Sequence, residues 1–354
     1  MTQKTDDLRI EKTMQLLPPI ALIERFPISD SASETVFACR KAIHNLLHGD
    51  DDRILVVVGP CSIHDVDAAM DYANRLVEMR KKYSGELEIV MRVYFEKPRT
   101  TVGWKGLVND PDMDGSFKIN DGLRIARNLL SKINDLGLPT AGEFLDVISP
   151  QYVADFMSWG AIGARTTESQ VHRELSSGLS CPVGFKNGTN GSIQIAIDGI
   201  GSANNPHNFL SVTKFGHSAI IKTKGNEDCH IILRGGSGQP NYEEKFVNEA
   251  STKLNESGVV DKVMIDFSHA NSAKQFKRQL DVCKDVSSQI ASGNKKIFGV
   301  MVESNIVEGQ QKVVEGQPLT YGQSITDGCV GWEDTETILY DLAQAVSSRR
   351  SGLK

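Results

Sequence analysis

Eight short apolar runs alternate with amphipathic stretches along most of this chain. Glycine and proline bound the runs, and continuous apolar sequence of this length is typical of strands buried on both faces of a parallel sheet. In chain order the runs read LVVVGPC, EIVMRVYF, TAGEFLD, AIGART, VGFKNG, HIILRGG, VMIDFSH and FGVMVES. Eight such strands with intervening helices predict a (β/α)8 TIM barrel, an α/β fold whose active site lies at the carboxyl ends of its strands.

The spacing of apolar residues also predicts helices and a division of the chain. The predicted helices cover residues 33–47, 65–83, 121–136, 149–158, 168–178 and 333–349. The first strand is expected at about 54–61, so residues 1–48 form an N-terminal extension and residues 49–354 form the catalytic barrel. Long loops are expected at 96–120, on the active-site face, and at 304–331.

An insertion is predicted between the fifth and sixth strands, within the irregular stretch 201–229. The runs FLSVT and HSAIIKT flank Lys-Phe-Gly, and two β-prone runs around a glycine-containing turn predict a β-hairpin at about 208–223. A plain crossover between two barrel strands does not need this hairpin. We therefore interpret the hairpin as an insertion into the barrel.

A chemically capable residue lies near the carboxyl end of each predicted strand. These residues are Cys61, Arg92, Glu143, Arg165, Lys186, Arg234, His269 and Glu303. Because a closed parallel barrel brings all of its strand ends to one mouth, we expect these side chains to gather there.

A candidate metal site combines three of these residues with Asp327. Cys61, His269 and Glu303 follow the first, seventh and eighth predicted strands, and Asp327 lies in the loop after the last one. One thiolate, one imidazole and two carboxylates suit one divalent ion of the Mn, Fe, Co or Zn class. Taken singly, such residues are more often a buried cysteine, a capping histidine and surface carboxylates. Their shared location favours the metal site.

A candidate anion site combines Arg92, Arg165, Lys186 and Arg234 from the second, fourth, fifth and sixth predicted strands. Arginine binds phosphate or carboxylate through a planar fork, and lysine binds as a point charge. A ligand with both a phosphate and a carboxylate would use several of them. The alternative is a network of internal salt bridges, although four cations at one mouth are hard to neutralise within the protein.

The segment KPRT at 97–100 directly follows the second predicted strand. Proline stiffens the turn, and the arginine and threonine offer donors for a second phosphate. An isolated KPRT segment would more often be an exposed basic turn. The glycine-rich RGGSG at 234–238 matches neither a Walker loop nor a dinucleotide fingerprint, so nucleotide binding is not expected.

Composition excludes several other classes of protein. The 354-residue chain has a formal net charge of −6 and no long basic tract, which argues against nucleic-acid binding. It has no apolar run long enough to cross a bilayer, and its charged N-terminus lacks the apolar region of a secretory signal. Six scattered cysteines without a CxxC pattern fit a reducing compartment, so we expect a cytoplasmic enzyme without a membrane partner.

Seven longer segments resemble one known family. They are GPCSIHD at 59–65, MRVYFEKPRTTVGWKGL at 91–107, GARTTESQ at 163–170, PVGFKNGT at 182–189, HIILRGG at 230–236, DFSHAN at 266–271 and SITDGCVGWEDT at 324–335. They are similar to those of type I 3-deoxy-D-arabino-heptulosonate-7-phosphate (DAHP) synthases, and the similarity covers essentially the whole chain. The resemblance implies a metal-dependent 3-deoxy-7-phosphoheptulonate synthase, which condenses phosphoenolpyruvate with erythrose 4-phosphate at the start of the shikimate pathway.

The resemblance also implies residue roles. The implied metal ligands are Cys61, His269, Glu303 and Asp327. Phosphoenolpyruvate would contact Arg92, Arg165, Lys186 and Arg234, with Glu143 and the backbone of Ala164 nearby. Erythrose 4-phosphate would contact Lys97, Pro98, Arg99 and Thr100. Lys97 is then a candidate proton donor and Glu143 a candidate for activating water, while Arg92, Lys186 and His269 belong to the same catalytic set.

Within the family, the segment TDDLRI at 5–10 and the hairpin sequence are most similar to the phenylalanine-inhibited form. Asp6 and Asp7 lie too early to belong to the barrel core, so we expect them to reach a neighbouring subunit of a dimer or tetramer. Tyrosine- and tryptophan-inhibited relatives share the catalytic motifs, so these motifs do not decide the effector. The positions expected to line the inhibitor pocket are Asp6, Asp7, Ile10, Phe144, Asp146, Val147, Pro150, Gln151, Leu175, Leu179, Ser180, Phe209, Ser211 and Ile221.

Two other functions are compatible with the barrel. One is a related phosphoenolpyruvate synthase that uses a longer sugar phosphate, and activity with each aldehyde would separate the two enzymes. The other is a non-catalytic amino-acid sensor, which would bind phenylalanine without releasing phosphate from the two substrates. The complete metal and anion sets argue against the sensor.

Overall fold

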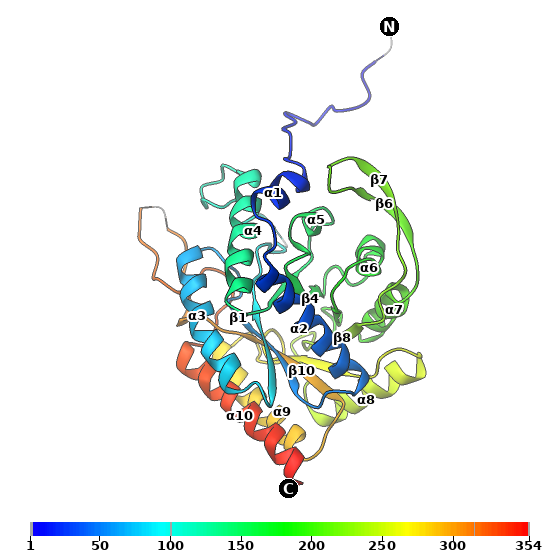
Figure 1. Ribbon diagram of the computed structural model, residues 1–354, viewed down its shortest axis with the longest axis vertical. Coiled ribbons are helices and arrows are strands. Elements are labelled where there is room, and N and C mark those ends of the chain that lie inside the picture. Colours follow the sequence, from blue (N-terminus) through cyan, green and yellow to red (C-terminus); the bar gives the residue numbers. More distant parts are fainter. Residues whose placement is uncertain (1–2, 100, 315, 353–354) are drawn as a thin grey trace.

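The computed structural model describes residues 3–99, 101–314 and 316–352 (Figure 1). Eight parallel strands close into a barrel in the order β1-β10-β9-β8-β5-β4-β3-β2, which confirms the predicted (β/α)8 fold. The barrel strands are β1 (Ile54–Gly59), β2 (Leu87–Arg92), β3 (Thr140–Glu143), β4 (Met157–Ile162), β5 (Val183–Lys186), β8 (Cys229–Leu233), β9 (Val263–Asp266) and β10 (Ile297–Glu303).

Alternating residues of each strand build two apolar layers. On β1, Leu55 and Val57 belong to the packed interior of the barrel, together with Trp159 and Met301. The neighbouring Val56 belongs to the outer layer, between the sheet and the surrounding helices. Both sets are buried, which explains why the strands are continuous apolar runs without a polar face.

The helices between the strands cover the outside of the barrel. They are α3 (Val66–Lys82), α4 (Ile119–Asp135), α5 (Pro150–Val153), α6 (Gln170–Ser176), α7 (Gln194–Ala203), α8 (Glu244–Glu256), α9 (Gln279–Ala291) and α10 (Trp332–Ser351), with the 3-10 turn η1 (Phe276–Arg278). At the start of α3, Asp65 accepts hydrogen bonds from the N–H groups of Asp67 and Ala68, as an N-cap does.

Two of the predicted segment boundaries are wrong. The helix predicted over 149–158 ends at Val153, because Met157 already begins β4 and its apolar run is buried in the sheet. The stretch 201–229 is not irregular from its start, because α7 continues to Ala203. The sequence patterns also gave no separate prediction for α7, α8 or α9.

The N-terminal extension contains α1 (Pro19–Arg25) and α2 (Asp30–His48), of which only α2 was predicted. Pro19 takes the first helical position of α1, where proline needs no hydrogen-bond donor. The apolar face of α2, including Ile43, Leu46 and Leu47, packs with the interior residues of the barrel and covers its amino end. In Figure 1 the chain before α1 projects away from this body as an extended tail.

The inserted hairpin is present, as predicted. Strands β6 (Asn208–Val212) and β7 (Ser218–Lys222) pair antiparallel, and Gly216 takes a positive φ of 79° in the turn. The long loop 304–331 contains a small sheet of β11 (Val307–Gln310) and β12 (Gln323–Ser324). Among the helices of the described chain, none is long and apolar enough to span a membrane.

Arg127 joins the extension to the barrel. Its fully buried guanidinium donates to the carbonyl oxygens of Phe26 and Tyr152 and forms two bonds of 2.7 and 2.8 Å with the carboxylate of Asp155. These contacts connect the end of α1, the centre of α4, and α5 with the residues that follow it. The extension is therefore packed as part of the barrel from α1 onward.

Replacing Arg127 with methionine is expected to lower the free energy of unfolding by about 2–4 kcal/mol, because the carboxylate of Asp155 loses its buried partner. Arg124→Met is the matched control on the same helix, since Arg124 pairs with Asp121 in a largely exposed contact. The control should change the unfolding free energy by less than about 0.5 kcal/mol. Urea denaturation followed by circular dichroism measures both values, and equal losses would contradict the role assigned to Arg127.

Candidate active site

A cavity of about 570 Å³ lies at the carboxyl ends of the barrel strands. This active-site cavity collects side chains from most of the barrel and from the loops after β2 and β10. Of the residues selected from the sequence, those lining it are Arg92, Lys97, Pro98, Arg99, Glu143, Ala164, Arg165, Lys186, Arg234, His269, Glu303 and Asp327. Cys61 lies fully buried beside it, and Thr100 lies outside the described residues.

Three of the four expected metal ligands form a compact group. The Sγ atom of Cys61 and one carboxylate oxygen each of Glu303 and Asp327 lie within 4.8 Å of one another. Cys61 and Glu303 are buried, whereas Asp327 is exposed. Burial and the nearby carboxylate of Glu303 raise the pKa of the Cys61 thiol. Thiolate and carboxylate donors together fit a borderline divalent ion of the first transition row.

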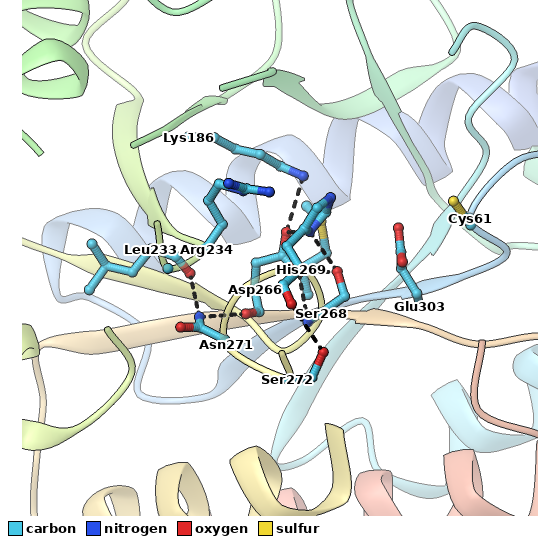
Figure 2. A network of polar contacts seen from close by, with 12 residues as sticks. Cys61, Lys186, Leu233, Arg234, Asp266, Ser268, His269, Asn271, Ser272 and Glu303 are labelled. Carbon is cyan, nitrogen blue, oxygen red and sulfur yellow. Dashed lines mark hydrogen bonds and ion pairs between the residues drawn. The ribbon is translucent and has the colours of Figure 1, made fainter. Parts of the chain in front are cut away.

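His269 lies outside this compact group, which differs from the expected four-residue set. Its Nδ1 atom lies 3.0 Å from the carboxylate of Asp266 and 2.7 Å from the hydroxyl of Ser268 (Figure 2). Histidines that bind metals usually direct their second ring nitrogen to such a carboxylate, so this contact fits a ligand role. His269 also has a φ of 58°, an uncommon conformation that is often found at functional sites.

Arg92 is buried and already paired within the protein. Its guanidinium donates to Glu303 Oε1 at 3.0 Å and to the carbonyl oxygen of Pro60 at 3.1 Å, and it lies over the ring of Tyr94. Although burial raises the pKa of Glu303, Arg92 and other cations hold it below its usual value. For this arginine, the alternative of an internal salt bridge therefore holds.

Lys186 has an internal partner as well. Its Nζ atom lies 3.1 Å from the carboxylate of Asp266, and both side chains are at least 96% buried (Figure 2). Burial disfavours the charge of Asp266, but Lys186 and His269 hold its pKa well below the ordinary value. Asp266 therefore fixes both side chains, and leaving either charge unpaired would be costly.

The remaining cations lie closer to the solvent. Arg234 is partly exposed, and burial together with the charge of Arg165 lowers its pKa despite the carboxylate of Asp266. Arg165 and Arg99 are exposed, and Arg99 donates from Nε to the carbonyl oxygen of Trp104 at 2.7 Å. The cavity thus combines two buried ion pairs with a more accessible cationic rim.

Lys97 connects the rim to the metal-type ligands. Its Nζ atom lies 3.1 Å from both the sulfur and the carbonyl oxygen of Cys61. Glu143, at the end of the neighbouring strand β3, also lines the cavity and lies close to Gly163, where an added Cβ would come within 2.4 Å of its carboxylate. A larger residue at position 163 would therefore require the Glu143 carboxylate to move.

Sequence reasoning missed three residues that position the others. Asp266 orders Lys186 and His269, Ser268 contacts the His269 ring, and the Tyr94 ring lies against the Arg92 guanidinium. Asp266 is the last residue of β9, so a carboxylate at a strand end was the available signal. Only the closed structure shows that its partners come from β5 and from the loop after β9.

Most of the residues expected to bind an inhibitor come from the hairpin, the segment after β3 and the region of α6. Phe209 pairs with Ile221 across the hairpin, and both lie with Ser211 on its half-buried face. From the segments after β3 and around α6 come Phe144, Asp146, Val147, Pro150, Gln151, Leu175, Leu179 and Ser180. Asp6, Asp7 and Ile10 are exposed on the extended tail, and the described chain does not bring them into this group.

A buried carboxyl group lies between this region and the active-site cavity. Glu96 precedes Lys97 and accepts a hydrogen bond of 2.8 Å from the hydroxyl of Ser149, whose backbone N–H donates to Asp146. Burial, followed by the charges of Asp146 and Glu143, raises the pKa of Glu96 to about 7. Glu96 and Ser149 also line a small internal cavity with Glu143 and Phe144.

The barrel is closed and parallel, and its mouth carries buried ion pairs and metal-type ligands. These features define the class of protein: a barrel enzyme that acts on anionic substrates. The sequence profile described as the DAHP synthetase I family matches residues 25–340. The chain therefore belongs to this family.

Individual relatives match over nearly their whole length. A "Phospho-2-dehydro-3-deoxyheptonate aldolase, Phe-sensitive" of Escherichia coli strain K12 is 67% identical over 350 residues, or 99% of this chain and 100% of that protein. A Trp-sensitive aldolase of Escherichia coli O157:H7 is 54% identical over 346 residues, or 98% and 99% of the two chains. The solved structure of the Francisella tularensis SCHU S4 aldolase superimposes with a TM-score of 0.94 at 55% identity, covering 96% of this chain and 99% of that one.

The raised pKa of Glu96 predicts a pH-dependent stability. The folded state holds this proton more tightly than the unfolded chain does. The protonated carboxyl group therefore contributes to the free energy of unfolding below the ordinary glutamate pKa, and this contribution is lost as the pH rises through about 7. Glu96→Gln keeps a neutral side chain at every pH. Relative to wild type, the variant should gain about 2–3 kcal/mol of unfolding free energy between about pH 5 and pH 8. Urea denaturation across this range measures the gain, and a difference independent of pH would exclude it.

Proposed function

We propose that this chain condenses phosphoenolpyruvate with D-erythrose 4-phosphate and water, giving 3-deoxy-D-arabino-heptulosonate 7-phosphate and inorganic phosphate. This is the first step of the shikimate pathway to the aromatic amino acids. The observation that carries the proposal is one cavity that is lined by the cations, Glu303 and Asp327 and has Cys61 beside it, in a chain of the DAHP synthetase I family. The six free, buried cysteines fit a reducing cytoplasm.

Phosphoenolpyruvate carries a carboxylate and a phosphate, and the proposed site for it contains cations of two kinds. Arg92 and Lys186 are held in place by Glu303 and Asp266, so their positions are fixed before substrate arrives. Arg165 and Arg234 lie nearer the cavity mouth, where the backbone of Ala164 is also available. Preorganised donors of this kind lower the cost of binding and of developing negative charge.

Erythrose 4-phosphate is assigned to the loop after β2. Pro98 and Arg99 line the cavity next to Lys97, and Thr100 of the same segment lies outside the described residues. The planar guanidinium of Arg99 suits the terminal phosphate of the sugar. Its aldehyde would then point inward, toward Lys97 and Cys61.

Cys61, Glu303 and Asp327, with His269 as a fourth ligand, would hold one divalent ion of the Mn, Fe, Co or Zn class. The donor set fits such an ion, and the Asp266 contact orients the His269 ring for it. When bound, the ion would polarise the aldehyde of the sugar phosphate as a Lewis acid.

The side chains around the substrates then have separate tasks. As C3 of phosphoenolpyruvate bonds to the aldehyde carbon, the Lys97 ammonium is placed to give a proton to the new alkoxide. Water adds at C2 of the former enol ester, and cleavage of its C–O bond releases inorganic phosphate. Glu143 is the candidate to accept the proton of that water, and the arginines keep the anion oriented.

The direct test measures phosphate release with purified substrates. Phosphate should form only when both phosphoenolpyruvate and erythrose 4-phosphate are present, and a five-carbon sugar phosphate should react far more slowly. A strong chelator should abolish turnover, and Mn²⁺ or Co²⁺ should restore it. Binding of phenylalanine without phosphate release would favour the amino-acid sensor instead.

A matched pair of variants checks the assignment of the two substrates. Arg234→Met should weaken use of phosphoenolpyruvate by roughly 30- to 1000-fold, because a charge-assisted bond to a buried anion is worth about 2–4 kcal/mol. Arg99→Met should mainly affect erythrose 4-phosphate. Equal effects of each variant on both substrates would contradict the assignment.

The region around the hairpin is proposed as an inhibitor site for phenylalanine. Its apolar side chains Phe209, Ile221 and Leu175 come from the hairpin and α6, and Ser180 follows that helix. Asp6 and Asp7 would be supplied by the tail of a neighbouring copy in a dimer or tetramer, since they are exposed here. The Glu96–Ser149 hydrogen bond offers one physical connection from this region to the Lys97 loop.

Phenylalanine is expected to inhibit phosphate release more strongly than tyrosine or tryptophan. Ser180→Phe should block phenylalanine binding while leaving turnover intact, because Ser180 is exposed and does not line the active-site cavity. Equilibrium binding and rate assays with the three amino acids measure both effects. Ser177→Ala, at a buried site on the same segment, controls for general destabilisation. Inhibition by tyrosine alone would refute the effector assignment.

A further inference from the structure

A second group of metal-type ligands lies at the end of the barrel opposite to the active-site cavity. In the part of the chain that the structure describes, His44, His48 and Asp228 each place a ligand atom within 4.8 Å of the other two. His44 and His48 lie in the last turns of α2, and Asp228 immediately precedes β8. Strand β8 runs from this end toward the cavity, so its length separates the group from Cys61 and Glu303.

Both imidazole rings converge on one oxygen atom. His44 Nδ1 lies 2.7 Å and His48 Nε2 lies 3.0 Å from Asp228 Oδ1, and the two ring centroids are 4.3 Å apart. Histidines four residues apart on one helix face are a known chelating pair for zinc. Zinc bonds of about 2.0–2.2 Å place tetrahedral ligands about 3.4 Å apart, so each ring would retreat by less than about 1 Å to admit an ion.

The three side chains are both accessible and well supported. Their exposed fractions are 40% for His44, 33% for His48 and 19% for Asp228, so an ion can enter from solvent. The backbone N–H of Asp228 donates to the side chain of Asn226, whose amide is anchored on the carbonyl oxygens of Ser176 and Cys181. Helix α2 is fixed by its apolar face, so the ligands lie on rigid supports.

A neighbouring arginine on the same helix does not occupy the group. Arg40 lies one turn before His44, and its guanidinium donates to the carbonyl oxygens of Ala154 and Met157. The buried cysteine Cys229 follows Asp228 directly but is not among the three grouped ligands. The available donors are therefore two nitrogens and one carboxylate.

We propose that His44, His48 and Asp228 bind one divalent transition-metal ion of the zinc type, with water at the remaining position. Two imidazoles and one carboxylate select such an ion over Mg²⁺ or Ca²⁺, which prefer sets of oxygen ligands. The ion would join the end of α2 to the first residues of β8. It would act as a clamp between the N-terminal extension and the barrel, independently of the reaction in the cavity.

The test counts bound Zn²⁺ per chain after chelator treatment, reloading and desalting. His48→Ala should lose one equivalent relative to its parent, both in the wild-type background and in a Cys61→Ala background that lacks the active-site thiolate. In the Cys61→Ala background, Zn²⁺ should also raise the unfolding temperature, and His48→Ala should remove this rise. The affinity should fall at least about 100-fold, since even the loss of an outer contact to a ligand costs about 10–100-fold.

Controls separate this site from ordinary surface binding. His217→Ala removes an exposed histidine from the hairpin turn and should leave the count and the temperature shift unchanged. X-ray absorption of Zn²⁺ in the Cys61→Ala protein should show nitrogen and oxygen neighbours without sulfur. An unchanged count in His48→Ala, or loss of a sulfur neighbour on removing Cys229, would overturn the proposal. Absence of bound Zn²⁺ in the Cys61→Ala protein would also overturn the proposal, and His44, His48 and Asp228 would then form only an ion-pair cluster.

Discussion

Strand β1 pairs with β2 on one side and with β10 on the other, and the site depends on this double pairing. The register places Gly59 of β1 opposite Glu303 of β10, while β2 ends at Arg92. Cys61 therefore follows β1 into the space between a carboxylate and a guanidinium that are distant in sequence. If the sheet opened between β1 and β10, these two strands would lose their shared edge and the Cys61–Glu303 grouping would be lost.

Charge compensation shapes the mouth of the barrel. The Arg92–Glu303 and Lys186–Asp266 pairs are buried, so each cation is fixed by a carboxylate before any ligand is present. Burial alone would make these charges costly, and pairing offsets much of that cost without removing the positive character of the outer rim. An enzyme of this design offers an anion fixed donors in its interior and more adjustable arginines near the solvent.

Much of the architecture could be predicted because parallel strands buried on both faces have an unmistakable apolar pattern. Strand ends also located most of the cavity residues, since barrel closure brings those ends together. The same reasoning could not find the partner of Lys186, because Asp266 lies 80 positions away and only register decides which strand ends touch. It also extended a helix into β4, where Met157 and its neighbours are apolar enough for either structure. The spacing of His44 and His48 on one helix face was a signal in the sequence, but Asp228 could not be linked to them, because its proximity depends on how α2 lies across the amino end of the barrel.

The position of α2 has a consequence for the order in which the protein is made. This helix leaves the ribosome before any strand, yet its apolar face packs on residues that extend to Met301. During synthesis Ile43, Leu46 and Leu47 therefore lack a part of their final partners until β10 has emerged. Such long-range contacts slow folding and leave apolar surface exposed to other chains. Apolar surface at the amino end of the barrel thus remains open to aggregation until the last strands have emerged.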